Sequence, residues 1–275
     1  MPATSTQGYA SNGIFFRVAG EGEPLLLLHG LMVNVEMFDP LVDLLRDDFR
    51  MLIPDLRGHG KSGTVAGPCD VAALATDLDA VLAEAGFERC SVLGYSHGGA
   101  VAQQLAHTRP ARVARMMLGC TYAQNAGTRR ERLEGAIFET LLRFIDPGTL
   151  GRLAIRPSKT KPGVPVGLTR EQALWVRGLM ASNGRGAMRS AVRGMLAFDS
   201  GPWLAELKVP TLVIAGSDDT AVPRYHYDML VKGIAGACGR IIDRAEHTLI
   251  WTHTGELAQI IRTQWAGDAG RATTA

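Results

Sequence analysis

The feature that most constrains this sequence is the run of residues 90–99, C-S-V-L-G-Y-S-H-G-G. Residues 91–93 predict a short buried strand, and residues 100–106 predict a helix, so the chain must turn sharply between them. Such a tight turn tolerates only small residues two positions either side of its centre, which Gly94 and Gly98 provide. We therefore expect Ser96 to have a strained backbone and a hydroxyl standing alone at the positive end of a helix. The alternative is a glycine-rich turn with a chance serine, so any function of Ser96 depends on partners elsewhere.

The overall composition limits the class of protein. The 275 residues are 46% hydrophobic, enough for one large α/β domain or for a core with an inserted subdomain. A net charge of +2 gives no reason to expect nucleic acid as a partner. No apolar run approaches membrane-spanning length, and no signal-peptide pattern is present, so we expect no membrane partner. The four cysteines lack C-x-x-C spacing, which favours free thiols in a cytoplasmic protein without disulfide or metal site.

Strand and helix patterns alternate through the first part of the chain. Strands are predicted at residues 14–18, 25–28, 51–53, 91–93 and 113–118, and helices at 38–45, 70–85 and 100–106. This alternation predicts a mostly parallel sheet with helices on both faces. The polar residues 1–12 predict no regular element.

From about residue 122 only helical patterns occur, until strands resume near residue 210. The helices are predicted at 128–145, 170–180 and 186–198, and the later elements are strands at 210–216 and 240–242 and a closing helix at 257–265. We therefore expect three segments. These are the first part of an α/β core at 1–121, an inserted helical cap at 122–205, and the second part of the core at 206–275.

A serine hydroxyl becomes a useful nucleophile when a base removes its proton and an acid orients that base. Two candidate acids, Asp218 and Asp219, follow the predicted strand that ends near Gly216, and His247 follows the last predicted strand. The carboxyl ends of strands are where α/β sheets place their sites, so these side chains are predicted to lie near Ser96.

Each of these choices has an ordinary alternative. The aspartate pair also suits a turn, and a late histidine can simply lie on the surface. His226 and His253 are other candidate bases, but each lies inside or before a predicted helix rather than at the end of a strand.

The same chemistry needs donors for a developing oxyanion. The predicted strand 25–28 ends at His29-Gly30, where a glycine lets the backbone turn so that the Leu31 amide can face the carbonyl oxygen. The His97 amide, directly after the serine, is the second expected donor. His29 itself has no matching metal-ligand pair in sequence, so we expect it to support its loop by hydrogen bonds.

Taken together, these segments resemble the α/β-hydrolase superfamily, in particular its small soluble esterases and enol-lactonases with a helical cap. The motifs appear in family order over about residues 13–121 and 206–265: L-L-L-L-H-G, P-D-L-R-G-H-G-K-S, G-Y-S-H-G-G, P-T-L-V-I-A-G-S-D-D-T-A-V-P and a late histidine. The family places its acid three residues after the strand-ending glycine and four before the proline, which implies Asp219 rather than Asp218. It also implies structural roles for Asp55 and Arg57.

The resemblance implies a serine hydrolase of the α/β-hydrolase fold that cleaves a small carboxylic ester or lactone through an acyl-enzyme. Ser96 would be the nucleophile, His247 the base and Asp219 its orienting acid. Leu31 and His97 would supply the oxyanion amides, and no cofactor is implied. Alternatives on the same residues are a cofactor-free perhydrolase or haloperoxidase and a carbon–carbon bond hydrolase. Outside enzymes, the alternative is a ligand receptor that binds without turnover.

The small net charge hides an uneven distribution. Residues 122–205 contain 13 basic and 6 acidic side chains. Positive charge above a site would attract an anionic substrate, which makes a carboxylate-bearing ester or lactone one expectation. The alternative is that these arginines are solvated, because Arg185, Arg189 and Arg193 recur every four residues and form one stripe. The natural substrate and the oligomeric state stay open.

Overall fold

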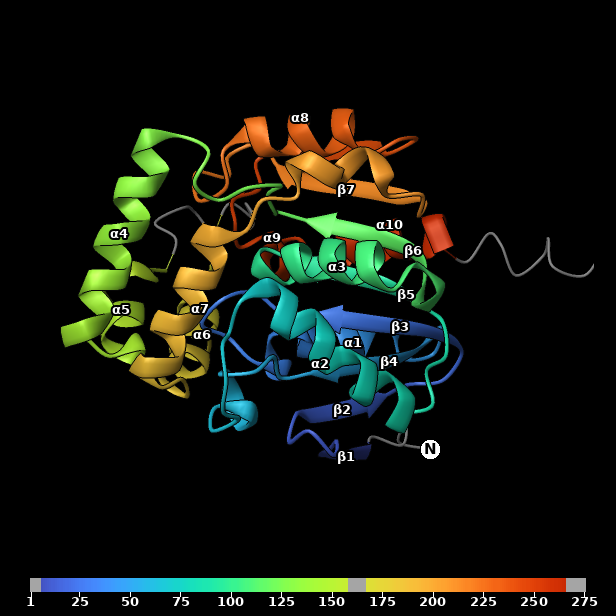
Figure 1. Cartoon of the computed structure of the whole chain (residues 1–275), viewed down its shortest axis with the longest axis horizontal. Helices are drawn as coiled ribbons and strands as arrows, with labels where there is room; N and C mark the ends of the chain where they lie inside the picture. The colour runs from blue at the N-terminus through green and yellow to red at the C-terminus, as the bar shows by residue number, and fades with distance from the viewer. Residues whose placement is uncertain (1–5, 158–166, 266–275) are drawn as a thin grey trace, which may run out of the picture.

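The computed structural model describes residues 6–157 and 167–265. Within these residues eight strands form one sheet in the order β1-β2-β4-β3-β5-β6-β7-β8 (Figure 1). β1 and β2 are antiparallel to their neighbours, and the other strands run parallel. The strands are β1 (Thr6–Tyr9), β2 (Phe15–Ala19), β3 (Glu23–Leu28), β4 (Phe49–Pro54), β5 (Cys90–Tyr95), β6 (Val113–Gly119), β7 (Thr211–Gly216) and β8 (Cys238–Ile242).

The first strand departs from the prediction of no regular element. β1 pairs antiparallel with β2 at the edge of the sheet, with Gln7 opposite Arg17. An edge strand is held by main-chain hydrogen bonds, which its polar side chains do not reveal. One ring contact adds to them, because Tyr9 packs edge-on against Phe15 with 5.3 Å between ring centroids. Residues 1–5 lie outside the described residues.

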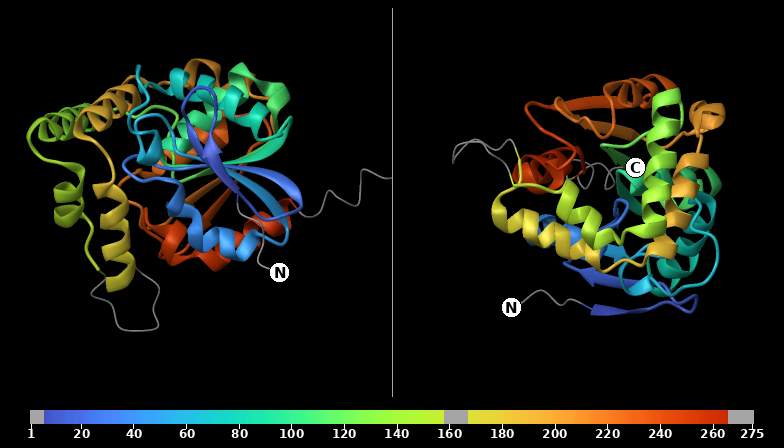
Figure 2. Two further views of the ribbon diagram at one scale, coloured as in Figure 1. Left: turned by 90° about the horizontal axis from the view of Figure 1, so that it is seen from below. Right: turned by 90° about the vertical axis from the view of Figure 1, so that its left-hand side faces the viewer.

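Helices cover both faces of the sheet, as the alternating pattern predicts (Figures 1 and 2). One layer contains α2 (Val71–Glu84), α3 (His97–Thr108) and α8 (Arg224–Gly233), and the other contains α1 (Asp39–Leu45), α9 (Leu249–Thr252) and α10 (Thr254–Trp265). The leucines of β3 show why its apolar run is continuous. Leu26 and Leu28 enter the core beneath α2 and α3, while Leu25 and Leu27 enter the opposite core.

Four helices lie beyond the carboxyl ends of the parallel strands, at the left of Figure 1. They are α4 (Arg129–Phe144), α5 (Pro147–Ala154), α6 (Arg170–Ala181) and α7 (Arg185–Ala197). The prediction lacked α5, which is short and contains two glycines; it begins where the Asp146 side chain accepts a hydrogen bond from the Thr149 amide. The division of the chain at residues 121 and 205 stays a prediction.

The arginine stripe on α7 packs against α4. Arg189 and Arg193 each lie 2.8 Å from the same Glu139 oxygen, and Arg185 donates to the carbonyl of Arg143 near the end of α4. The stripe therefore joins two cap helices, an arrangement that neither sequence-based alternative included. None of the helices in the described ranges combines the length and the apolar character that crossing a membrane requires.

Three fully buried histidines support the loops at the carboxyl end of the sheet. The Nδ1 of His29 lies 2.8 Å from the next carbonyl and its Nε2 accepts from the Leu56 amide at 3.0 Å, so His29 braces its loop as expected. The ring of His59 stacks edge-on at 5.0 Å from His29, and the Nδ1 of His97 lies 3.0 Å from the Tyr122 hydroxyl. Burial lowers the pKa of His29 to about 4 and the pKa values of His59 and His97 to about 3.

These pKa values predict a loss of stability in mild acid. The unfolded chain protonates all three histidines below about pH 6.5, whereas the folded chain does not until about pH 4 or lower. Burial raises the pKa of Asp55 to about 6, so the folded state takes up one compensating proton between about pH 6 and 4. Near pH 5 the unfolded state therefore holds about two more protons than the folded state. For each pH unit of acidification, the free energy of unfolding falls by roughly 3 kcal/mol.

Urea unfolding midpoints measured from pH 7 to pH 5 test this expectation. The midpoint should fall as the pH falls. In His59→Gln, whose new side chain cannot titrate, the unfolding free energy should depend less steeply on pH, by the equivalent of about one proton. A midpoint that does not change with pH over this range would contradict the analysis.

Candidate active site

The turn between β5 and α3 centres on Ser96, whose φ of 53° and ψ of −121° are strained for a residue other than glycine. The neighbouring strand β6 holds this conformation. The Ser96 amide donates to the Gly119 carbonyl at 2.8 Å, and the Ser96 carbonyl accepts from the Thr121 hydroxyl at 2.6 Å. The predicted strand–turn–helix is therefore present, with the serine at its strained centre.

The two glycines that flank the turn are required by contact. A Cβ atom on Gly98 would lie 2.1 Å from the Leu28 carbonyl oxygen, and one on Gly94 would lie 2.4 Å from the Gly98 carbonyl oxygen. Both oxygens belong to the backbone and cannot move aside. Any larger residue would push α3 away from β5 and β3.

The loops that follow β7 and β8 bring two more side chains to Ser96. The Nε2 atom of His247 lies 3.1 Å from the Ser96 Oγ, and the Nδ1 atom of His247 lies 2.9 Å from the Asp219 Oδ2. These distances allow a continuous chain of hydrogen bonds from carboxylate to imidazole to hydroxyl. The three residues lie at the carboxyl ends of β5, β7 and β8, as the sequence predicts.

The two aspartates after β7 have different surroundings. Asp219 is almost completely buried, and its Oδ1 accepts from the amides of Ala221 and Val222, both at 2.9 Å. Burial alone would raise the pKa of Asp219, but the hydrogen bonds from His247 and from the Val222 amide outweigh it and lower the pKa, so the carboxylate is ionised. Asp218 is exposed and accepts from its neighbour Ser217 at 3.0 Å. The geometry thus brings Asp219, and not Asp218, to His247.

The alternative histidines are engaged elsewhere. His226 lies in α8, with its Nε2 2.9 Å from the Glu131 Oε1, and His253 contacts the Thr252 hydroxyl at 2.8 Å. Asp55 and Arg57 have the structural contacts that the resemblance implies. Asp55 accepts from two loop amides at 2.7 Å, and Arg57 forms an ion pair with Asp77.

The loop between β3 and residue 35, called here the Leu31 loop, approaches Ser96 closely. A Cβ atom on Gly30 would lie 3.3 Å from the Ser96 Cβ, which is a tight contact, so glycine favours the close approach of the two residues. Gly30 does not have a positive φ, so its backbone does not need the conformational freedom of glycine. The Leu31 amide has no acceptor among the described residues. His97 is the first residue of α3, where the amide has no carbonyl one turn earlier in the helix. Both amides are thus available as donors beside Ser96.

The cap fixes the position of this loop through one side chain. Asn183, in the turn between α6 and α7, donates from its Nδ2 to the Met32 carbonyl at 2.9 Å. Its Oδ1 accepts from the Gly60 amide at 3.1 Å. Met32 itself has a positive φ of 65°, so the buried asparagine holds a strained residue directly after Leu31.

Sequence reasoning missed two residues of the site. The Tyr95 hydroxyl donates to the His247 carbonyl at 2.7 Å, which ties the turn to the histidine loop. Cys120, with a strained φ of 45°, directly follows β6, and its sulfur, an Asp219 oxygen and a His247 nitrogen lie within 4.8 Å of one another. The position of Cys120 at a strand end was the signal that could have found it. All four cysteines are free thiols, as predicted.

The set of Cys120, Asp219 and His247 also contains donor atoms that can bind a metal ion. In the present arrangement, however, the imidazole and the carboxylate are hydrogen-bonded to each other. The contacts of these two residues therefore match an acid and base pair that acts on Ser96.

A cavity of about 170 Å³ lies directly against Ser96 and His247. Its wall is mostly apolar and comes from the loop after β3, the residue that follows α5, and α6. The side chains include Leu31, Met32, Met37, Ile155, Val176 and Met180. None of the arginines in the described residues lines it. The cavity suits an uncharged group of modest size.

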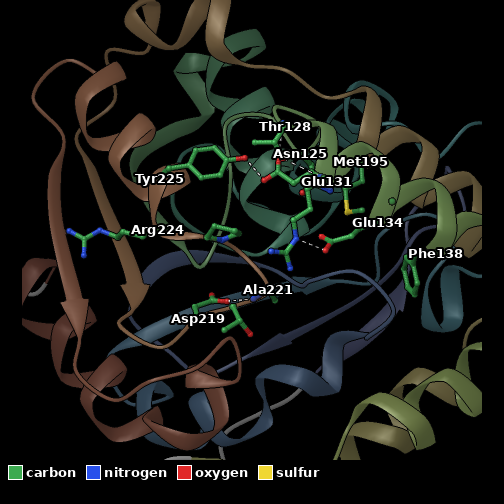
Figure 3. Close-up of a pocket in the computed structure, with 14 residues that line it drawn as sticks. Asn125, Thr128, Glu131, Glu134, Phe138, Met195, Asp219, Ala221, Arg224 and Tyr225 are labelled. Carbon is green, nitrogen blue, oxygen red and sulfur yellow. Dashed lines mark hydrogen bonds and ion pairs between the residues drawn. The ribbon is translucent and has the colours of Figure 1, made fainter.

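A second cavity, of about 750 Å³, opens on the other side of Asp219, between α4 and the loop after β7 (Figure 3). Its wall combines apolar and charged side chains, and the charged ones are paired. Arg130 binds Glu134 at 2.7 Å, Glu131 accepts from the Tyr225 hydroxyl, and Arg224 points away from the cavity in Figure 3. This cavity therefore offers no surplus of positive charge to an anion.

Comparison with known proteins agrees with this geometry. A family model described as the alpha/beta hydrolase fold matches residues 23–254. The chain is 29% identical over 245 residues to RutD of Azorhizobium caulinodans, a carbamate hydrolase candidate, covering 87% of this chain and 91% of RutD. It is 29% identical over 238 residues to the poly(3-hydroxyalkanoate) depolymerase of Ectopseudomonas oleovorans, covering 86% of this chain and 82% of the depolymerase.

Among solved structures, an esterase from Thermogutta terrifontis superposes with a TM-score of 0.81 at 26% identity, covering 95% of this chain and 98% of the esterase. The predicted fold class and the predicted resemblance are both confirmed. The family model covers most of the chain and spans the turn at Ser96 and the loops that carry Asp219 and His247. The chain belongs to the α/β-hydrolase family.

Proposed function

We propose that this protein is a serine hydrolase that cleaves a small carboxylic ester or lactone through an acyl-enzyme. The observation that carries the proposal is the chain of hydrogen bonds from Asp219 through His247 to Ser96, at 2.9 and 3.1 Å. A strained serine, an oriented imidazole and an ionised, buried carboxylate are what acyl transfer requires of these three groups.

In the first half of the reaction His247 takes the proton of the Ser96 hydroxyl as the oxygen attacks the substrate carbonyl carbon. The carbonyl π electrons move to oxygen, and the amides of Leu31 and His97 donate to that oxyanion. The tetrahedral intermediate then expels the alcohol oxygen, which receives the proton from His247. Asp219 stabilises the imidazolium while it exists and keeps the imidazole in the required orientation.

In the second half a water molecule replaces the alcohol. His247 removes a proton from this water, the hydroxide oxygen attacks the acyl carbon, and the same amides stabilise the new oxyanion. The intermediate releases Ser96, whose oxygen takes the proton back from His247, and the carboxylic acid leaves. With a lactone the alcohol and acid groups belong to one product.

The cavity against Ser96 supports an uncharged, compact substrate. A protein cavity of about 150 Å³ can hold a benzene ring, so about 170 Å³ suits a short acyl chain or a small ring. The cap arginines do not support the anionic substrate expected from charge counting. Arg189 and Arg193 bind Glu139, and Arg177 donates to the Ile155 carbonyl rather than into the cavity.

The nucleophile is tested with Ser96→Ala. Hydrolysis of p-nitrophenyl butyrate should fall by roughly a millionfold in kcat, because no other group replaces the serine oxygen. Circular dichroism should report an unchanged fold. Wild-type labelling by a serine-directed phosphonate, absent in the variant, separates an enzyme from a ligand receptor. Residual activity within about tenfold of wild type would refute the assignment.

The acid is tested with a matched pair of substitutions. Asp219→Asn should lower kcat by about 10⁴, because the amide favours the wrong imidazole tautomer. Asp218→Asn has the same chemistry at a neighbouring exposed position and should retain activity within a few-fold. Equal effects, or effects in the reverse order, would show that the acid has been misassigned.

The substrate class is tested with p-nitrophenyl esters of increasing acyl length. Wild type should prefer acetate or butyrate to octanoate, and Met180→Ala should move the optimum to longer chains, with gains of roughly tenfold on the first substrates that wild type excludes. Met195 lines the other cavity, so Met195→Ala serves as the control and should leave the preference for acyl length unchanged. Neutral esters should also be preferred to matched carboxylate-bearing esters at low and at high salt. A preference for the anionic ester that salt abolishes would restore the anionic-substrate hypothesis.

A further inference from the structure

Helix α4 has apolar side chains on two opposite sides. On the inner side Leu142 is completely buried, and a Cβ atom on Gly135 would lie 2.3 Å from a methyl carbon of Leu196 in α7. On the outer side Leu133, Ile137, Leu141 and Phe144 are 62%, 50%, 38% and 77% exposed. Their spacing of four, four and three residues places them in one line along the helix. A surface helix ordinarily presents polar residues on its free side, so this line is unusual.

Positive charge surrounds this apolar line. Arg129, Arg130, Arg132 and Arg143 are exposed on the same helix, whereas the exposed acid, Glu134, is already paired with Arg130 at 2.7 Å. The two other acids of α4 are half-buried. Glu131 contacts Tyr225 and His226, and Glu139 contacts the α7 arginines. The free side of α4 is therefore apolar along its length and cationic at its margins.

This face lies at the outside of the molecule. α4 lies at the left of Figure 1 together with α5, away from the sheet, and it is on the side that faces the viewer in the right-hand view of Figure 2. We propose that the outer face of α4 docks the protein on an anionic lipid surface. Leu133, Ile137 and Phe144 enter the boundary between headgroups and acyl chains, and the flanking arginines bind lipid phosphates.

The positive charge of α4 favours an anionic lipid surface over a second copy of the chain. A symmetric dimer through α4 would place the same arginines of both copies against one another, with only the already paired Glu134 to offset them. An anionic surface instead neutralises Arg129, Arg132 and Arg143 at once. A groove on a partner protein also fits less well, since a groove encloses a helix and α7 already occupies the inner side of α4.

This proposal departs from one expectation from sequence. The absence of a run long enough to span a bilayer led us to expect no membrane partner, but docking at the interface needs no such run. It is also independent of the proposed reaction, because it rests on α4 alone and not on Ser96, His247 or Asp219.

Co-sedimentation of the full-length protein with lipid vesicles tests the proposal. The protein should bind vesicles of phosphatidylcholine mixed with phosphatidylglycerol, bind phosphatidylcholine alone at least several-fold less, and be released as salt rises. Ile137→Gln with Phe144→Gln should lower the bound fraction at least fivefold, and Arg129→Gln with Arg143→Gln should remove the salt dependence. Thermal melts of each variant establish that it is folded.

Two substitutions away from α4 are the matched controls. Leu44→Gln changes a partly exposed leucine of α1, and Arg89→Gln removes an exposed arginine before β5; both should bind like wild type. Three results would overturn the proposal: no sedimentation with anionic vesicles, equal loss of binding in the controls, or a concentration-dependent dimer that Ile137→Gln with Phe144→Gln abolishes while vesicle binding is absent.

Discussion

The structure depends on one strained turn, at Ser96, and the turn depends on the strands either side of β5. The backbone of Ser96, with a φ of 53°, is held in its strained conformation by two contacts. Its amide donates to the Gly119 carbonyl on β6, and Gly98 packs against the Leu28 carbonyl on β3. Neither contact lies within the turn itself. The position of the Ser96 hydroxyl therefore depends on three adjacent parallel strands, and local sequence alone would not maintain it.

The order of the sheet explains how distant residues meet. β3, β5, β6, β7 and β8 are consecutive in the sheet, and the ends of these strands supply Leu31, Ser96, Cys120, Asp219 and His247 in the same order. Parallel strands place their carboxyl ends along one edge, so each short loop has only to extend a few residues across it. This leaves the chemistry to loops of few residues on a rigid frame, which keeps the distances between reacting atoms small.

Sequence predicted the parts of the site that follow from this frame. Ser96 and His247 are 151 residues apart, yet both could be placed because each follows an apolar strand. Sequence did not predict side-chain contacts between residues that are far apart in the chain and have no local pattern to mark them. Cys120 resembled an ordinary buried thiol, and Arg189 gave no sign of Glu139, which lies 50 residues earlier. β1 was missed for a related reason, because main-chain pairing at an edge does not depend on side-chain type.

The buried side chain of Asn183 changes how the cap can behave. It is hydrogen-bonded at once to the strained Met32 and to the Gly60 loop, so the turn between α6 and α7 and the loop that carries the Leu31 amide form one mechanical unit. Lifting that turn away from the core would break both hydrogen bonds, release the two loops and let Met32 relax. Since Met180 of α6 and Leu31 line the same cavity, a movement of α6 that widened the cavity would also shift the loop that carries the Leu31 amide beside Ser96.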